Sequence, residues 1–265
     1  MGNKESILYH SNAFLLSLLL FMGMLLLLNL GAFIGQRLRK KLDNPNESIN
    51  GTVLAAVLGL FGFLLAFTFS MAGTRYEARR TNDITEANAI GTAVLRADLY
   101  PDSTRLAFRR DFKAYITARI AYFGAGADLD TMSMADHVAE QFGIKLWTRA
   151  ATAAKNTTSI FPGNLMVPAL NEMLDSSNAN NYGEKFRVPD PIIILLFALS
   201  MVCAFFVGYQ YPAKGWFNWT ITTGFCFLCS MVIYITLDLD RPRTGLIRTH
   251  ASHQAIVELV RQFDK

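Results

Sequence analysis

Four stretches of the sequence contain no charged residue, although the chain of 265 residues carries 25 lysines and arginines and 21 aspartates and glutamates. They are residues 13–35, 51–73, 191–213 and 215–237, and each has about the length that a helix needs to cross the hydrocarbon core of a bilayer. A soluble enzyme, a disulfide-rich secreted domain and a β-barrel are excluded, because none of them is built from long uncharged segments. The sequence therefore predicts an all-α integral membrane protein with four transmembrane helices.

The order of apolar and polar segments predicts two transmembrane hairpins that flank a soluble helical domain. Residues 1–73 hold the first hairpin, 74–188 the helical domain, 189–237 the second hairpin and 238–265 a polar tail.

Short polar segments, residues 42–50 and the residues around Lys214, are predicted to turn the chain within each hairpin. With four spans, both termini and the helical domain lie on one side of the membrane. Basic residues near the span ends are more numerous on that side, which favours the cytoplasm. We therefore expect a multi-pass protein of the plasma membrane, here a bacterial inner membrane, with cytoplasmic termini and a cytoplasmic helical domain.

Within the helical domain, residues 76–99 are predicted to continue the second span as a helix in water, and later helices are expected over about 134–155 and 164–180. Between residues 99 and 134, a further helix that begins near Asp102 has apolar residues at spacings of three and four. This face is predicted to be buried and the basic face to be in water. The apolar positions are Phe108, Phe112, Tyr115, Ile116 and Ile120, and the basic positions are Arg109, Arg110, Lys113 and Arg119.

The four spans contain no Asp, Glu, Lys, Arg or His. Proton-coupled carriers place ionisable groups at bilayer depth, so this composition argues against coupled transport. A pore that works through a hydrophobic constriction needs no such group.

No pattern for catalysis, metal binding or cofactor binding is found. Cys226 and Cys229 form a CxxC inside an apolar span without further ligands, and His250 and His253 form an HxxH without a third ligand. The net charge of +4 is not gathered in a basic stripe with interleaved aromatic residues, which argues against nucleic-acid binding. We therefore predict a protein that is not an enzyme and that holds no metal or cofactor.

The second span carries a stripe of small residues. Ala55, Gly59, Gly62 and Ala66 follow one another at steps of three or four, which places them on one helix face. Small residues let another helix approach closely, so this face is predicted to pack against a helix.

Two apolar ridges lie beside the small residues, and the sequence does not choose between them. One ridge contains Phe63 and Phe67, and the other contains Phe61, Leu65 and Phe69. In one interpretation the phenylalanines face lipid and pack in the ordinary way. In the other, identical copies form a ring with their small faces in contact, and one ridge closes a narrow apolar neck.

Charged residues follow the second span directly, where the mouth of a pore would lie. Arg75, Arg79 and Arg80 would concentrate anions there, whereas Glu77, Asp83 and Glu86 would form cation-attracting rings if they face the axis. The charges alone leave the selectivity open.

Three segments, residues 64–101, 170–175 and 237–248, resemble the bestrophin-like family of membrane proteins. Within the first segment, the run TRYEARR at 74–80 is similar to the RWWEAR turn of bacterial bestrophins, with one aromatic residue in place of two. Bestrophins are pentameric channels, most of them selective for anions, with an apolar neck on the second span.

The resemblance implies a homopentamer in which Phe67 corresponds to the innermost neck aromatic, with Phe63 one turn earlier and Gly59 before that. Because glycine forms no apolar ring, the alternative ridge stays open. The resemblance also favours chloride and other small anions, with cations as the second possibility.

We therefore expect passive ion conduction, with membrane lipid, small ions and further copies of the chain as partners. The alternative is a non-conducting membrane scaffold or sensor whose middle domain binds a partner.

Overall fold

The computed structural model describes residues 12–41, 51–156, 161–184, 186–210, 218–241, 243, 245–247 and 250–263. The predicted turns, residues 42–50 and Lys214, lie outside the described residues, as do the side chains of His250 and His253.

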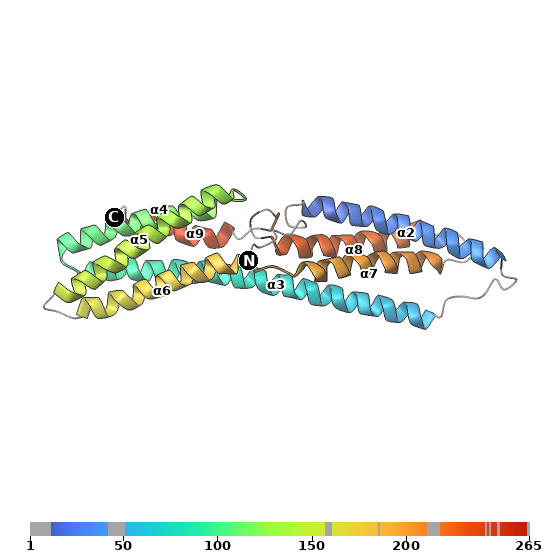
Figure 1. The fold of residues 1–265 in the computed structure, drawn as a ribbon, viewed down its shortest axis with the longest axis horizontal. Helices are drawn as coiled ribbons and strands as arrows, with labels where there is room; N and C mark the ends of the chain where they lie inside the picture. The colour runs from blue at the N-terminus through green and yellow to red at the C-terminus, as the bar shows by residue number, and fades with distance from the viewer. Residues whose placement is uncertain are drawn as a thin grey trace. The chain divides into compact units, whose positions relative to one another are not determined.

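Every regular element in the described residues is a helix, and the prediction of an all-helical protein is confirmed (Figure 1). The long helices are α2 (Ala13–Lys41), α3 (Gly51–Arg96), α4 (Asp102–Gly124), α5 (Leu129–Asn156), α6 (Phe161–Gly183), α7 (Asp190–Tyr209), α8 (Trp219–Leu239) and α9 (His250–Leu259). Two short 3₁₀ helices, η1 (Ala97–Leu99) and η2 (Val260–Phe263), follow α3 and α9.

Among the described residues, four helical segments are long and apolar enough to cross a membrane: Ala13–Lys41, Gly51–Leu99, Asp190–Tyr209 and Trp219–Leu239. Each contains one of the four uncharged stretches of the sequence or most of it. In the second segment the helix continues well beyond its apolar part without a break, because no proline interrupts the sequence before Pro101.

The chain divides into two compact units. Unit 1 comprises Met1–Arg75 and Arg187–Arg241, and unit 2 comprises Tyr76–Phe186 and Pro242–Lys265. Helix α3 contributes its first half to unit 1 and its second half to unit 2.

In unit 1, helix α2 packs along α7 and α8 (Figure 1). Phe14 of α2 meets Tyr234 of α8 edge to face, with ring centroids 6.3 Å apart. Phe21, two turns further along α2, meets the earlier residue Phe227 in the same way at 6.4 Å. Helices α2 and α8 therefore run in opposite directions.

Glycines bring α2 and α7 into close contact. A Cβ atom on Gly31 would collide with the carbonyl oxygen of Phe205, and one on Gly208 would collide with the carbonyl oxygen of Leu28. Gly35 has the same relation to the carbonyl oxygen of Tyr209. Gly31 and Gly35 form a GxxxG motif, which allows the backbones of two helices to touch.

Helix α2 therefore has its main partners in the C-terminal half of the chain. In the described part, α2 and α3 share no extensive contact, although they are consecutive in sequence and were expected to pair as a hairpin. The glycines explain this arrangement. Gly31 and Gly35 leave room on α2 for the backbone of α7, and Gly208 leaves room on α7 for the backbone of α2.

Unit 2 is organised around the apolar face of α4. Phe108, Phe112 and Ile116 are completely buried, Tyr115 is 1 % exposed, and Ile120 packs against the same core. The predicted buried face of α4 is thus confirmed. At the start of the C-terminal tail, the Arg243 guanidinium binds Glu184, the residue directly after α6, with Nη2–Oε2 at 2.7 Å.

Candidate functional site

In unit 1, α3 has a buried face and an exposed face. Phe61, Thr68 and Ala72 are at most 3 % exposed and recur at steps of seven and four, so they lie on one side of the helix. Phe63 is 67 % exposed and Phe67 is 55 % exposed on another side. Their rings stack with centroids 6.5 Å apart and an interplanar angle of 19°.

The small residues of α3 also lie on exposed surface. Ala55, Gly59, Gly62 and Ala66 are all exposed. A Cβ atom on Gly59 or Gly62 would meet nothing within 4 Å in the described residues. Within the described residues, therefore, no helix fills the small-residue stripe of α3, in contrast to the glycines of α2.

The second ridge is split between environments. Phe61 is 3 % exposed, Leu65 is partly buried and Phe69 is 41 % exposed. These three residues therefore do not present one continuous exposed surface within the described part of the chain.

Near the end of the apolar part of α3, the charged residues have different surroundings. In unit 1, the partly buried Arg75 lies with Nη2 3.8 Å from the sulfur of Met71. In unit 2, Glu77 and Arg80 form an exposed ion pair at 3.9 Å, whereas Arg79 is only 4 % exposed. Of these residues, Arg75, Glu77 and Arg80 have side chains accessible to solvent.

Asp83 and Glu86, which would form charged rings if they faced a pore axis, do not lie on an exposed face. Asp83 is 2 % exposed and Glu86 is completely buried in unit 2. Asn180 Nδ2 donates hydrogen bonds to Asp83 Oδ1 at 2.8 Å and to Glu86 Oε2 at 2.9 Å. Both carboxylates therefore belong to the interior of unit 2.

The partner of Glu86 is Arg119, which was expected to face water and is completely buried. Arg119 Nε and Nη2 donate to the two carboxylate oxygens of Glu86 at 2.5 and 2.9 Å, a bidentate arrangement. Nη1 donates to Asn181 Oδ1 at 3.1 Å, and the guanidinium lies over the ring of Tyr122. Although burial opposes it, the charge of Glu86 raises the pKa of Arg119, so this residue stays cationic.

The position of Arg119 on α4 was a signal for its burial. It lies four residues after Tyr115 and three after Ile116, both of which are buried, so it shares their face. It was expected to face water because isolated charges are seldom buried. Its partner lies 33 residues away on another helix, so the residues around Arg119 do not indicate it.

Comparison with known proteins gives a family. The sequence profile of the bestrophin-like domain matches residues 22–253, which is most of the chain. The chain belongs to the bestrophin-like family. Among curated proteins, none matches the sequence at a significant level.

Solved structures with the same fold include variants of a bacterial bestrophin homologue from Klebsiella pneumoniae. One has a TM-score of 0.70 at 11 % identity, with 96 % of this bestrophin-like chain and 97 % of the other chain covered. A second has a TM-score of 0.67 at 12 % identity, with 91 % and 97 % covered. At these identities the comparison shows a shared fold.

Proposed function

We propose that this bestrophin-like protein is an oligomeric channel that conducts small ions passively, through a pore lined by α3. The observation that carries the proposal is the exposed face of α3, on which Phe63 and Phe67 stack, while a Cβ atom on Gly59 or Gly62 would meet no described residue within 4 Å. A single chain leaves this face open, and copies arranged in a ring would cover it.

In the proposed oligomer, a pentamer, the small residues of α3 let neighbouring helices approach, and the phenylalanines close an apolar neck. The exposures of Phe63 and Phe67 favour them over the ridge that contains Phe61. Because a hydrophobic neck needs no ionisable group, the proposal agrees with the uncharged composition of the spans.

We propose anions as the permeant ions. The burial of Asp83 and Glu86 removes two carboxylates from the expected mouth of the pore, and the burial of Arg79 removes one cation. Arg75, Arg80 and Glu77 remain accessible, so each copy contributes an excess of one positive charge. Positive potential at a pore mouth raises the local anion concentration. The same proposal places unit 2 and both termini in the cytoplasm of a bacterial cell.

The test is a flux assay on the purified full-length protein in liposomes, with chloride and potassium gradients measured separately. Phe67→Ala is expected to raise the anion flux or to relax the selectivity, because it widens the proposed neck. Phe227→Ala is the matched control, since Phe227 on α8 is equally exposed at 55 % and is not proposed to line the pore. The control is expected to leave the flux unchanged.

If both variants conduct like the wild type, and Phe63→Ala does as well, the neck is not formed by this ridge. Absence of flux for both ions, with the oligomer intact, would refute the channel and leave the membrane scaffold or sensor as the function. A monomeric protein in mild detergent would also refute it, because a single chain then offers no path for ions.

A further inference from the structure

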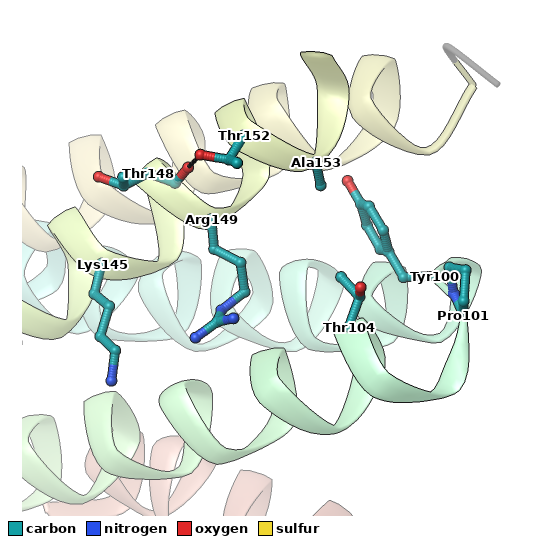
Figure 2. Close-up of a pocket in the computed structure, with 8 residues that line it drawn as sticks. All are labelled: Tyr100, Pro101, Thr104, Lys145, Thr148, Arg149, Thr152 and Ala153. Atoms are coloured by element: carbon teal, nitrogen blue, oxygen red, sulfur yellow. Dashed lines mark hydrogen bonds between the residues drawn. The ribbon is translucent and has the colours of Figure 1, made fainter. Parts of the chain in front are cut away.

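Unit 2 contains a hollow that no step of the proposed conduction uses. It lies between α5 and the turn that connects η1 to α4, and its volume is about 690 Å³ (Figure 2). Tyr100, Thr104, Lys145 and Arg149 supply most of its polar groups. The volume lies within the range of sites that hold small organic molecules, and it is much larger than a simple inorganic ion requires.

The hydroxyl group of Tyr100 is a buried donor without a hydrogen bond. Tyr100 is 4 % exposed, and its ring lies 5.0 Å from that of Phe108. Its hydroxyl oxygen is buried and makes no hydrogen bond to any described residue, although the side chain lines the hollow. A buried hydroxyl without a partner costs about 1–3 kcal/mol, so this group is poised to bind an acceptor.

Positive charge is in excess at the other end of the hollow. The carboxylate of Asp111 is 1 % exposed and is approached by Lys145 Nζ at 2.9 Å and by Arg149 Nη2 at 2.6 Å. Arg110 Nε lies 3.8 Å from the same carboxylate, so three cations surround one anion. Asp111 occupies Nε and Nη2 of Arg149, and Nη1 has no hydrogen bond within the described residues.

Asp111 itself remains a carboxylate in this surrounding. Burial would raise its pKa, but the hydrogen bonds and charges of Lys145 and Arg149 outweigh burial and lower it. The excess of positive charge is therefore present at neutral pH, and it is not removed by any of the polar groups at the opposite end.

We propose that the hollow binds a small organic anion. The acidic group, a carboxylate or phosphate, lies between Lys145 and Arg149, and an acceptor on the body of the molecule takes the hydrogen of the Tyr100 hydroxyl. Figure 2 shows Lys145 and Arg149 at one end of the hollow and Tyr100 at the other, with Thr104 beside Tyr100. The proposed anion site does not depend on ion conduction, so its test is independent of the test of the channel.

The test uses the purified full-length protein and four organic anions as probes: adenosine monophosphate, glucose 6-phosphate, citrate and glutamate. Binding is measured by isothermal titration calorimetry, with adenosine and glucose as uncharged counterparts. At least one anion is expected to bind with a Kd below about 1 mM, and the uncharged counterparts are not. A preference for phosphates or for carboxylates identifies the acidic group.

Tyr100→Phe removes only the unpartnered hydroxyl, and it is expected to weaken binding about 2–10-fold while leaving the melting temperature unchanged or higher. Tyr115→Phe is the matched control, because Tyr115 is also buried in unit 2 but does not line the hollow. Lys145→Gln is expected to weaken binding by a similar factor, whereas Lys113→Gln, on the exposed side of α4, is not. Equal affinities for all variants would overturn the proposal, as would binding of none of the four anions.

A neighbouring copy of the chain is the other possible occupant, and cysteine labelling distinguishes it. Thr152 lines the hollow and is exposed, and the three native cysteines are at most 7 % exposed. Thr152→Cys is expected to react with a maleimide in the intact oligomer and to be protected by a bound anion. Protection without any added anion would mean that a neighbouring copy covers the hollow, which would overturn the proposal.

Discussion

Replacing Arg119 by methionine is expected to destabilise unit 2 strongly. The substitution keeps an unbranched side chain of comparable length and removes the cation that binds Glu86 bidentately. Glu86 would then remain buried beside Asp83, with both carboxylates sharing the amide of Asn180. Two buried carboxylates that accept hydrogen bonds from the same amide nitrogen repel each other, and neither can recover its hydration.

The magnitude follows from the burial of both partners, whose side chains are 0 % exposed. Breaking a buried pair by removal of one partner costs about 3–5 kcal/mol. For a unit of this size, each kcal/mol lowers the melting temperature by about 3–4 °C, so Arg119→Met is expected to lower it by about 10–20 °C.

The assay is thermal unfolding of the full-length protein in detergent, followed by circular dichroism, together with amide hydrogen exchange of α4 and α6. The matched control is Arg109→Met on the same helix. Arg109 binds Asp98 with Nη2–Oδ2 at 3.1 Å, but the two side chains are 32 % and 40 % exposed. Because solvent screens such a pair, the control is expected to cost about 0–1 kcal/mol.

The double variant Glu86→Gln, Arg119→Met supplies the second measurement. The two changes are expected to cost less together than the sum of their separate costs, with a coupling of about 0.5–3 kcal/mol. If Arg119→Met melts no lower than Arg109→Met, the buried pair does not stabilise unit 2 as argued. The same holds if the free-energy costs of Glu86→Gln and Arg119→Met simply add in the double variant.

Two further predictions concern the glycine contact and the response to acid. Gly208→Ala places a methyl group against the carbonyl oxygen of Leu28, so it is expected to destabilise the folded protein by about 1–3 kcal/mol and to lower its yield and melting temperature. Gly224→Ala is the control and is expected to leave both unchanged, because its added methyl group meets no described residue within 4 Å. Lys145 and Arg149 outweigh burial and lower the pKa of Asp111 below its ordinary value, so its contribution to stability is complete above about pH 4 and is lost as the pH falls through the lowered pKa. Acid unfolding monitored by circular dichroism should therefore show a smaller loss of stability below pH 4 in Asp111→Asn than in the wild type; an identical loss in both would contradict the assignment.

Much of the local structure could be predicted from the pattern of residue types. The apolar face of α4 followed from the spacing of Phe108, Phe112 and Ile116, because side chains three and four apart share a helix face. The long α3 followed from the absence of proline before Pro101. Both features depend on neighbours within a few residues.

The surroundings of single charges could not be predicted in this way. Glu86 and Arg119 both have charges that normally face water, and each lies on a helix with other exposed charges. Their burial depends on the bidentate contact between α3 and α4 and on Asn180 of α6. Since the partners are far apart in sequence, no local pattern distinguishes this pair from a solvated one.

By itself, the sequence determined that the chain has four helices able to cross a bilayer, because only long uncharged segments are stable in hydrocarbon and their backbone must be satisfied within the helix. The tertiary structure decided which helix, α2 or α3, packs its small residues closely against another helix. Gly31 and Gly35 meet the backbone of α7, whereas Gly59 and Gly62 meet nothing within 4 Å, although both pairs have similar spacing and similar neighbours in sequence. The physical reason is that a small residue only permits close approach, and the helix that approaches is set by packing with segments far away in the chain.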